Sequence, residues 1–306
     1  MSKIIVGIDE SDRSRDAVAL TALLARGSDA ELVLVCAYPY DDVPGRAANA
    51  GYRQYLREDA EGALERATVG MDALPPLRKR AIAEVSPAKC IQNVATQEVA
   101  SLIVIGSSRR GAVGRVLAGT TAERLLHGAP CPVAVAPRGF HTLESGDIGT
   151  IVVGYNGSAE AKAALVGART IARVRGARLR LVEVLDATWM GTPALMQGPG
   201  YILTPDDAEA RALEYLTETA STLAHDVPTE PVVSVANPEQ VLADESKSAD
   251  LVVVGSRGYG PHRAVLLGSV SGRLVRESAC PVLVVPRGME APLEELFRSV
   301  PETQSV

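Results

Sequence analysis

Two glycine loops carry the residues whose types and spacing could bind a phosphate. In the second loop, the run Gly255 to Gly258 (GSRG) is followed after nine residues by Gly268 and Ser269. A glycine that ends an apolar strand permits a tight turn, and a second glycine lets the backbone approach a ligand closely. The free N–H groups and the dipole at the start of a helix attract an anion, and the Ser269 hydroxyl could cap that helix or bond a phosphate oxygen. These parts together suit a polyphosphate.

The chain carries this loop twice. GSSRRGAVGRVLAGTTAERLL from Gly106 aligns with GSRGYGPHRAVLLGSVSGRLV from Gly255 at a constant offset of 149 residues. The first copy keeps Gly119 and Thr120 in register but has Arg109 in place of the second glycine. We expect Arg109 either to reach the phosphates with its guanidinium or to fill the space.

Both loops are basic although the chain has a formal net charge of −6. Neither loop contains an acidic residue, and the cationic side chains are Arg109, Arg110 and Arg115 in the first and Arg257, His262 and Arg263 in the second. The alternative is that the glycines only shape a connection and the arginines are solvated. Repetition, position after a strand and charge favour phosphate binding over that alternative. The net charge disfavours a general nucleic-acid binder.

The histidines and cysteines do not indicate a metal or redox centre. The four histidines show no metal-ligand spacing and no triad with a serine, and His262 is either a phosphate contact or an exposed loop residue. No C-x-x-C pair is present. Cys131 and Cys280 recur in Cys-Pro-Val, which could suggest a redox pair, but we interpret them as small buried hydrophobes. We interpret Arg13 and Arg15 as solvated surface partners of Asp12 and Asp16.

The elements that must position these loops alternate along the chain. Apolar strands are predicted in the first half at 3–8, 31–37, 78–85, 101–106 and 132–137, and in the second half at 150–155, 178–185, 230–235, 250–255 and 281–286. Helices are predicted at 12–26, 52–73, after Pro87 and after Thr120, then at 159–175, 205–224, 239–246 and 269–277. Continuous apolar strands separated by helices indicate parallel sheets covered on both faces. The predicted fold class is α/β, with two tandem Rossmann-like open parallel five-stranded sheets.

The length of 306 residues fits two such units. We predict a first domain over 1–140, a linker over 141–149, a second domain over 150–288 and a C-terminal tail over 289–306 with a short helix. The segments 39–51 and 186–202 follow the second strand of each unit and could be lids or plain surface loops. No stretch is long and apolar enough for a membrane span, and the apolar run after Lys3 is too short for a secretory signal, so a cytoplasmic protein is expected.

The loop pattern resembles the nucleotide-binding branch of the universal stress protein family, whose signature is Gly-x-x-Gly, nine residues, then Gly-Ser or Gly-Thr. The motifs VGIDES and APCPV extend the resemblance over residues 3–287, and the chain looks like a tandem member with an adenine nucleotide α-hydrolase-like fold. The resemblance implies that ATP, with Mg²⁺, is the ligand. It also implies that the last strands of the two halves pair in an intramolecular pseudo-dimer, with a further homodimer possible through other surfaces.

The resemblance implies a site for each half. In the second half it would comprise Gly255, Ser256, Arg257, Gly258, Gly268, Ser269 and Val270 around the phosphates, with Asn156 near the ribose and Val184 near the adenine. In the first half it would comprise Gly106, Ser107, Arg109, Gly119 and Thr120, with Asp9 near the ribose and Ala37 near the adenine. Asn156 stands where the pattern has an acid, and it can hydrogen-bond a sugar hydroxyl without bringing charge. The second half is the better phosphate cradle, because its glycines are intact whereas the first half has Arg109 in place of the second glycine.

Three functions follow from this pattern. The first is an ATP-binding stress-response protein that acts as a nucleotide-dependent sensor or regulator, with at most slow ATP hydrolysis. The second is an enzyme that cleaves ATP to AMP and pyrophosphate, but GIDES and GYNGS lack the Ser-Gly-Gly-x-Asp-Ser type of loop such enzymes carry. The third is a structural or interaction module with degenerate loops and no nucleotide.

Overall fold

The computed structural model describes residues 1–40, 50–71, 74–108, 113–143, 146–186, 204–256, 269–289 and 293–297. The predictions made above for Arg109, Arg110, Arg257, Gly258, His262, Arg263 and Gly268 concern residues outside these ranges.

Each half supplies five strands and four α-helices to the described part of the chain. The first half contains β1 (Lys3–Ile8), α1 (Arg13–Ala25), β2 (Glu31–Tyr38), α2 (Ala50–Arg66), β3 (Leu77–Ala83), α3 (Pro87–Gln97), β4 (Leu102–Gly106), α4 (Thr120–Gly128), β5 (Val133–Ala136) and the 3₁₀ helix η1 (Phe140–Thr142). The second half contains β6 (Thr150–Gly154), α5 (Ala159–Arg175), β7 (Arg178–Asp186), α7 (Pro205–Leu223), β8 (Thr229–Ala236), α8 (Pro238–Glu245), η3 (Ser246–Ser248), β9 (Leu251–Gly255), α9 (Ser269–Glu277), β10 (Val282–Val285) and η4 (Glu294–Phe297). The predicted α/β fold with two repeated parallel units is confirmed.

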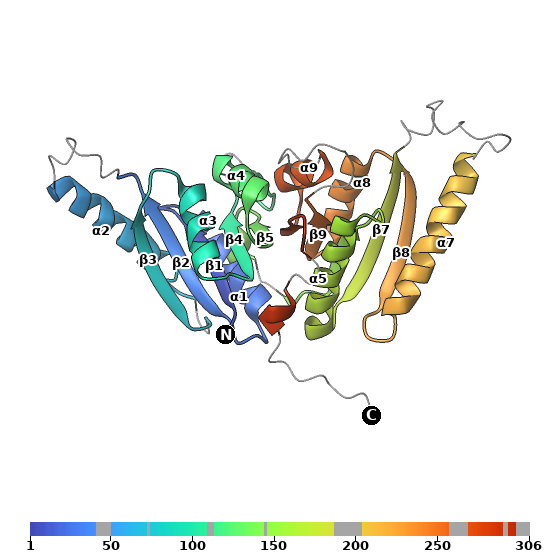
Figure 1. Cartoon of the computed structure of the whole chain (residues 1–306), viewed down its shortest axis with the longest axis horizontal. Helices are drawn as coiled ribbons and strands as arrows, with labels where there is room; N and C mark the ends of the chain where they lie inside the picture. The colour runs from blue at the N-terminus through green and yellow to red at the C-terminus, as the bar shows by residue number, and fades with distance from the viewer. Residues whose placement is uncertain are drawn as a thin grey trace.

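The strands form one ten-stranded sheet in the order β3-β2-β1-β4-β5-β10-β9-β6-β7-β8. Pairing is parallel within each half, and the last strands of the two halves pair antiparallel, with Leu283 opposite Ala134. Figure 1 shows the two halves meeting at the centre, with α2 and α7 at the outer ends. The apolar last strands are therefore covered by each other rather than left as open edges.

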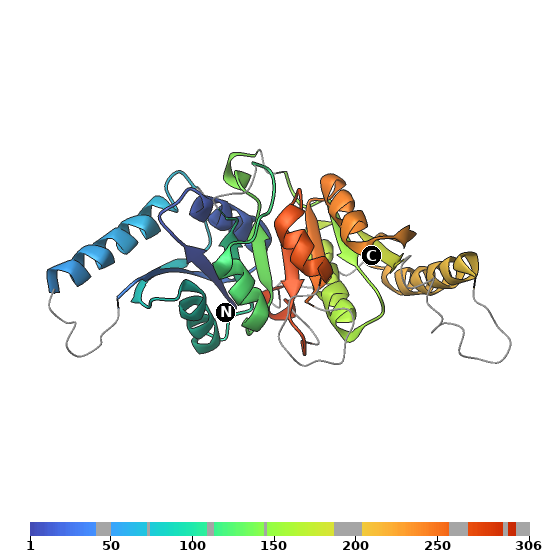
Figure 2. The same ribbon diagram turned by 90° about the horizontal axis from the view of Figure 1, so that it is seen from above.

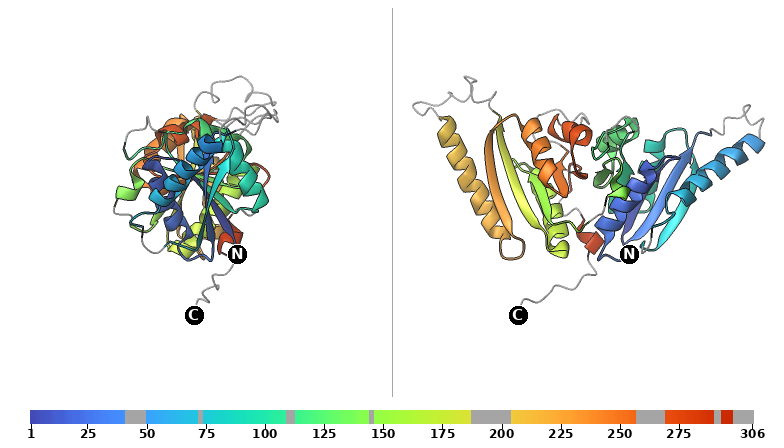
Figure 3. Two further views of the ribbon diagram at one scale, coloured as in Figure 1. Left: turned by 90° about the vertical axis from the view of Figure 1, so that its left-hand side faces the viewer. Right: turned by 180° about the vertical axis from the view of Figure 1, so that it is seen from behind.

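Side chains alternate between the two faces of the sheet, and each face is covered by its own helices. Ile4 and Val6 of β1 pack in a cluster with residues of α1, α2, α5 and α7, whereas Ile5 packs in a second cluster with residues of α3, α4, α8 and α9. Both clusters include residues from both halves. Views from one end and from behind show the same layered arrangement (Figure 3).

Polar residues at the helix starts explain where several helices begin. The Ser158 hydroxyl accepts a hydrogen bond from the N–H of Ala161 at the start of α5, and Thr204 and Asp207 form a capping box at the start of α7. Gly176 adopts a left-handed conformation (φ 64°) that ends α5. The expected helix over 52–73 is wrong at its C-terminal end, because α2 ends at Arg66 and is followed by turns that include Gly70 at φ +71°.

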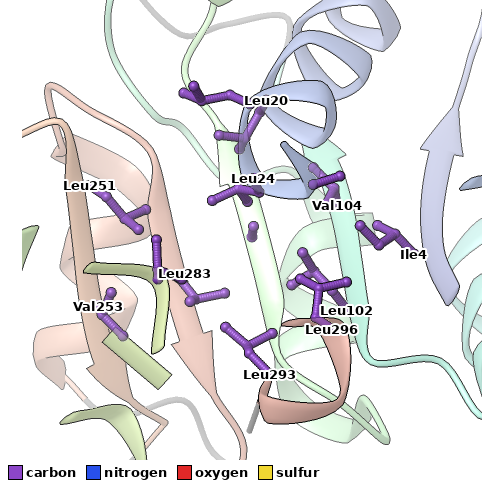
Figure 4. Close-up of a cluster of buried hydrophobic side chains, with 14 of the residues drawn as sticks. Ile4, Leu20, Leu24, Leu102, Val104, Leu251, Val253, Leu283, Leu293 and Leu296 are labelled. Atoms are coloured by element: carbon purple, nitrogen blue, oxygen red, sulfur yellow. The ribbon is translucent and has the colours of Figure 1, made fainter. Parts of the chain in front are cut away.

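Residues 293–297, which follow β10 in the chain, pack into the core. Leu293, Leu296 and Phe297 are buried and join the cluster on the α1 and α5 face. Figure 4 shows Leu293 and Leu296 among side chains of both halves, including Leu283 and Leu102. The predicted short helix is present as η4, whose buried Leu296 and Phe297 pack between the two halves. No helix in the described ranges combines the length and hydropathy that a membrane crossing requires.

Candidate functional site

The two candidate clefts lie where the strand order reverses. In the first half the chain runs outward from β1 to β2 and β3 and then returns to β4 on the other side of β1. The second half repeats this arrangement with β6 and β9. Open parallel sheets bind ligands beyond the carboxyl ends of the strands at such reversal points. Asp9 and Ser107 directly follow β1 and β4, Ser256 directly follows β9, and Asn156 is the second residue after β6.

The structure brings most of the predicted first-half residues to one end of the sheet. Ala37 lies near the end of β2, Gly106 ends β4, and Thr120 begins α4. The N–H of Ser108 donates to the carbonyl of Leu117 at 2.6 Å, which folds the described end of the loop back onto β4. The hydroxyl of Ser107 is buried and bonds the Ala136 carbonyl at 2.7 Å. Any contact from Ser107 to a nucleotide would therefore come from its backbone.

The first glycine of each loop is required by helix packing. A Cβ at Gly106 would lie 2.4 Å from the carbonyl oxygen of Arg13, and a Cβ at Gly255 would lie 2.7 Å from the Cβ of Glu160. Arg13 and Glu160 belong to the first turns of α1 and α5. These two glycines thus allow each helix to start close against the neighbouring strand end, whatever else they do.

Gly119 has a different environment. A Cβ there would meet the Ser108 side chain only at 3.5 Å, an ordinary contact, and the φ of −91° is accessible to any residue. Gly119 also precedes α4 with no side chain capping the helix start. The protein's own atoms do not require a glycine here, and the first N–H groups of α4 have no capping side chain. This is the arrangement that an anion at a helix start would use.

The carboxylate of Asp9 makes several hydrogen bonds within the protein. Its Oδ1 accepts from the N–H of Ser11 at 3.0 Å, from the Ser11 hydroxyl and from the Ser14 hydroxyl, and its Oδ2 accepts from Nη2 of Arg13 at 2.8 Å. Three of the four donors bind Oδ1, so Oδ2 keeps a lone pair that a ribose hydroxyl could use.

Arg13 lies across the reversal point of the first half. Besides its ion pair with Asp9, its Nη1 donates to the backbone carbonyl of Ser107 at 3.0 Å, and the side chain is 17% exposed. The interpretation of Arg13 and Arg15 as surface partners of Asp12 and Asp16 is wrong. Arg15 donates to the Val69 carbonyl at 3.3 Å, and Asp16 is buried.

Asp16 holds the segment that follows β5. Its Oδ2 accepts from the N–H of Gly139 at 2.9 Å, and its Oδ1 accepts from the N–H of His141 at 3.0 Å and lies 2.6 Å from His141 Nδ1. Asp16, which the sequence suggested as a solvated partner of an arginine, thus binds His141 of the predicted linker instead. Asp16 and His141 are 125 positions apart in the sequence, so no local pattern indicated this contact.

In the second half, the described residues also converge on the reversal point. Asn156 Oδ1 accepts from the N–H of Ser158 at 3.2 Å, and the Ser271 hydroxyl donates to the Ser256 carbonyl at 3.2 Å. Ser269 begins α9, while Val184 and Val270 are partly buried against the α8 and α9 face. Position 160, equivalent to Arg13, carries a glutamate whose Oε1 lies 3.2 Å from Nε of Arg287.

The structure also shows a polar cluster that the sequence did not suggest. The hydroxyl of Tyr155 lies 3.3 Å from that of Tyr215, their rings are stacked, and burial raises the pKa of Tyr155. Nearby, burial raises the pKa of the Glu183 carboxyl, whose Oε2 is buried without a hydrogen-bond partner. The sequence did contain a signal for the burial of Glu183. Side chains of a strand alternate between its two faces, which places Glu183 on the same face of β7 as Leu179 and Leu181.

A cavity of about 260 Å³ lies beside Asp9, between the start of α1 and the end of α2. Its lining is mixed in charge and includes Glu10, Arg15 and Arg66. A hydrogen bond with Asp59 raises the pKa of the Glu10 carboxyl. Within the described ranges, no three His, Cys, Asp or Glu side chains are grouped so that they could hold a metal ion.

Comparison with known proteins gives a consistent result. The model of the universal stress protein family matches residues 1–137 and again residues 148–286. A universal stress protein from Mycolicibacterium smegmatis is 30% identical over 295 residues, which cover 92% of this chain and 96% of that protein. A universal stress protein from Thermus aquaticus is 33% identical over 141 residues, covering 44% of this chain and 97% of its own length.

Solved structures share the fold across both halves. A universal stress protein from Archaeoglobus fulgidus superposes with a TM-score of 0.65 at 20% identity and covers 94% of this chain and 96% of its own. A similar protein from Pseudomonas aeruginosa gives a TM-score of 0.63 at 15% identity, with 97% of each chain covered. At these identities the likeness concerns the fold.

Proposed function

The chain belongs to the universal stress protein family, and on that premise we propose that it binds ATP and acts as a nucleotide-dependent sensor or regulator of a stress response in the cytoplasm. The observation that carries the proposal is the start of α4. There a Cβ at Gly119 would make only an ordinary contact with Ser108, the helix start has no side-chain cap, and Thr120 supplies a hydroxyl. A phosphate at this point would accept from N–H groups that already point out of the helix.

The residues fit an adenine nucleotide in the following way. Gly119 and Thr120, and Ser269 and Val270 in the second half, would hold phosphates, while Asp9 and Asn156 would lie near the ribose. The backbone at Ala37 and Val184 would face the adenine. Mg²⁺ bound with ATP would neutralise phosphate charge, and because Asp9 is engaged by Arg13, Ser11 and Ser14, the phosphates rather than Asp9 would hold it.

A regulatory role fits the loops better than a hydrolytic one. From Gly106 to Thr120 and from Gly255 to Ser269 the sequence contains no acidic residue and no lysine, so neither loop supplies a carboxylate to activate water on the γ-phosphate or a lysine to hold that phosphate. At most slow hydrolysis is expected. An assay of pyrophosphate and phosphate release tests this, and turnover at an ordinary enzymatic rate would overturn the regulatory proposal.

The second candidate function is an interaction module without nucleotide. The observation that favours it is the continuous sheet. Residues 282–284 of β10 pair with residues 133–135 of β5, so the two halves are joined as a pseudo-dimer. A further homodimer through other surfaces is also proposed. Size-exclusion chromatography with light scattering tests the homodimer, and a strictly monomeric protein would refute it.

Native mass spectrometry of the protein with and without Mg-ATP tests the leading proposal by counting nucleotides per chain. We expect binding, with one or two nucleotides. Gly268→Val and Ser269→Trp should remove the second-half nucleotide, because a side chain would occupy the phosphate position. Ser248→Trp, at an exposed position on η3, is the matched control and should not change the count. Absence of nucleotide at cellular ATP concentrations would favour the interaction module.

A further inference from the structure

Backbone groups of the first half cap the C-terminal end of a helix from the second half. The last four carbonyls of a helix have no partner within that helix. In α9 the Val275 carbonyl accepts from the N–H of Ala118 at 2.5 Å, and the carbonyl of Ser278, just beyond the helix, accepts from the N–H of Val116 at 2.8 Å. The side chains of Val116 and Val275 are buried in one hydrophobic cluster. A break in these hydrogen bonds would therefore leave polar groups unsatisfied away from water.

The same hydrogen bonds hold the proposed phosphate site of the first half. Ala118 directly precedes Gly119, the N-cap residue of α4, and Thr120 is the first residue of that helix. On the other side of the loop, the Leu117 carbonyl accepts from the N–H of Ser108, next to the end of β4. The start of α4 is thus held between the end of β4 and the end of α9, and a displacement of α9 would move it.

The other end of α9 lies in the second cleft. The helix has only nine residues, and the Ser271 hydroxyl attaches its first turn to the end of β9 by donating to the Ser256 carbonyl at 3.2 Å. Helices this short are marginal unless their surroundings stabilise them. The first four residues of α9 read Ser-Val-Ser-Gly, and none of these is a strong helix former. The stability of α9 therefore depends on the groups that contact its two ends.

Building on the proposed nucleotide binding, we infer that α9 couples the two clefts, so that ATP in the second cleft raises the affinity of the first cleft for ATP. A phosphate at the start of α9 would bind the N–H groups there and stabilise the helix. A more stable α9 keeps its last carbonyls in place for Val116 and Ala118, which position Gly119. Such coupling is reciprocal, so ATP in the first cleft also raises the affinity of the second. We expect each affinity to rise about fivefold.

Hydrogen exchange of the full chain, resolved to single amides, tests the coupling. Gly119→Val blocks the first cleft, so a nucleotide counted on this variant by native mass spectrometry occupies the second. Saturating Mg-ATP should then slow the exchange of the Val116 and Ala118 amides about fivefold, although the first cleft is empty. The Ala67 amide, at the end of α2 and far from the join between the halves, is the internal control and should not change.

Further variants, each made in the Gly119→Val background, show which contacts transmit the effect. Ser269→Trp removes the remaining nucleotide and should abolish the change in exchange. Arg115→Ala removes the hydrogen bond from Nη1 to the Glu277 carbonyl at the end of α9 and should reduce the slowing at least twofold. Arg124→Ala removes an exposed arginine from α4 and is the matched control, which should keep the full effect. If Gly119→Val does not fold, Thr120→Trp blocks the same cleft.

The possible outcomes separate the inference from the proposed function. The inference is overturned if the blocked variant binds one ATP but the Val116 and Ala118 amides exchange as before, or if Ala67 slows equally. It is also overturned if the unmodified protein binds ATP and the blocked variant binds none. The proposed function survives each of these results. If the unmodified protein binds no ATP, the proposed function fails and the inference fails with it.

Discussion

The backbone N–H of Val116 donates to the carbonyl of Ser278 at 2.8 Å and so ties the first glycine loop to the end of α9 in the other half. Ala118 donates to the Val275 carbonyl at 2.5 Å, and Nη1 of Arg115 donates to the Glu277 carbonyl at 3.0 Å. α4 and α9 lie side by side at the centre of the molecule when it is seen from above (Figure 2). The same helix that begins at Ser269 therefore ends against the other candidate cleft.

Arg115→Ala should lower the free energy of unfolding by about 1 kcal/mol, because the variant loses a charged hydrogen bond to the last turn of α9. Urea denaturation followed by circular dichroism measures the change. Arg124→Ala removes an exposed arginine from α4 and should alter the free energy by less than about 0.5 kcal/mol. Equal effects of the two substitutions would mean that the Arg115 contact adds nothing to the join between the halves.

Gly106→Ala and Gly119→Ala should separate packing from ligand binding. Alanine at 106 would place a Cβ against the Arg13 carbonyl, so a loss of about 1–3 kcal/mol in the free energy of unfolding is expected. Alanine at 119 meets only an ordinary contact, so the loss in the free energy of unfolding should be no more than about 1 kcal/mol, the cost of a poorer helix N-cap, while ATP binding in the first cleft is weakened. Chemical denaturation and calorimetry with ATP measure the two effects. Full ATP affinity in a folded Gly119→Ala variant would show that phosphate does not approach this backbone.

The four cysteines should be inert in the folded protein. Burial raises the pKa of Cys36, Cys131 and Cys280 to about 12 and that of Cys90 to about 11, above the ordinary value of about 9. Because the folded thiols hold their protons more tightly than the unfolded ones, they contribute stability below about pH 9 that is lost as the pH rises toward these values. Iodoacetamide at pH 8 should leave the native protein unmodified and label four thiols after denaturation. Rapid labelling of Cys131 or Cys280 in the native state would revive a redox role.

The sequence predicted the parts of the fold that depend on local pattern. Apolar runs such as the one that ends at Gly106 predicted the strands, and the alternating pattern predicted the helix over 159–175, whose start Ser158 caps in the structure. The repeated glycines also indicated the loops that lie at the two reversal points. A strand end followed by a helix start is a local pattern, so it can be recognised from neighbouring residues.

The parts that were missed depend on residues far apart in the chain. The engagement of Asp9 by Arg13 had a signal in their four-residue spacing, but the third partner, the Ser107 carbonyl, is brought there only by the pairing of β1 with β4. The contact of Asp16 with His141 likewise needs α1 packed beside η1. Such tertiary contacts leave no periodicity in the sequence.

Phe297 should contribute more to stability than its place near the end of the chain suggests. Its side chain is 3% exposed and belongs, with Leu293 and Leu296, to the hydrophobic cluster that spans both halves. Phe297→Ala removes most of that buried side chain and should lower the free energy of unfolding by about 3–5 kcal/mol. Tyr52→Ala, at a 54% exposed position on α2, is the control and should change it by less than about 1 kcal/mol. Urea denaturation of both variants makes the comparison, and a Phe297→Ala effect no larger than the control would show that η4 does not secure the two halves.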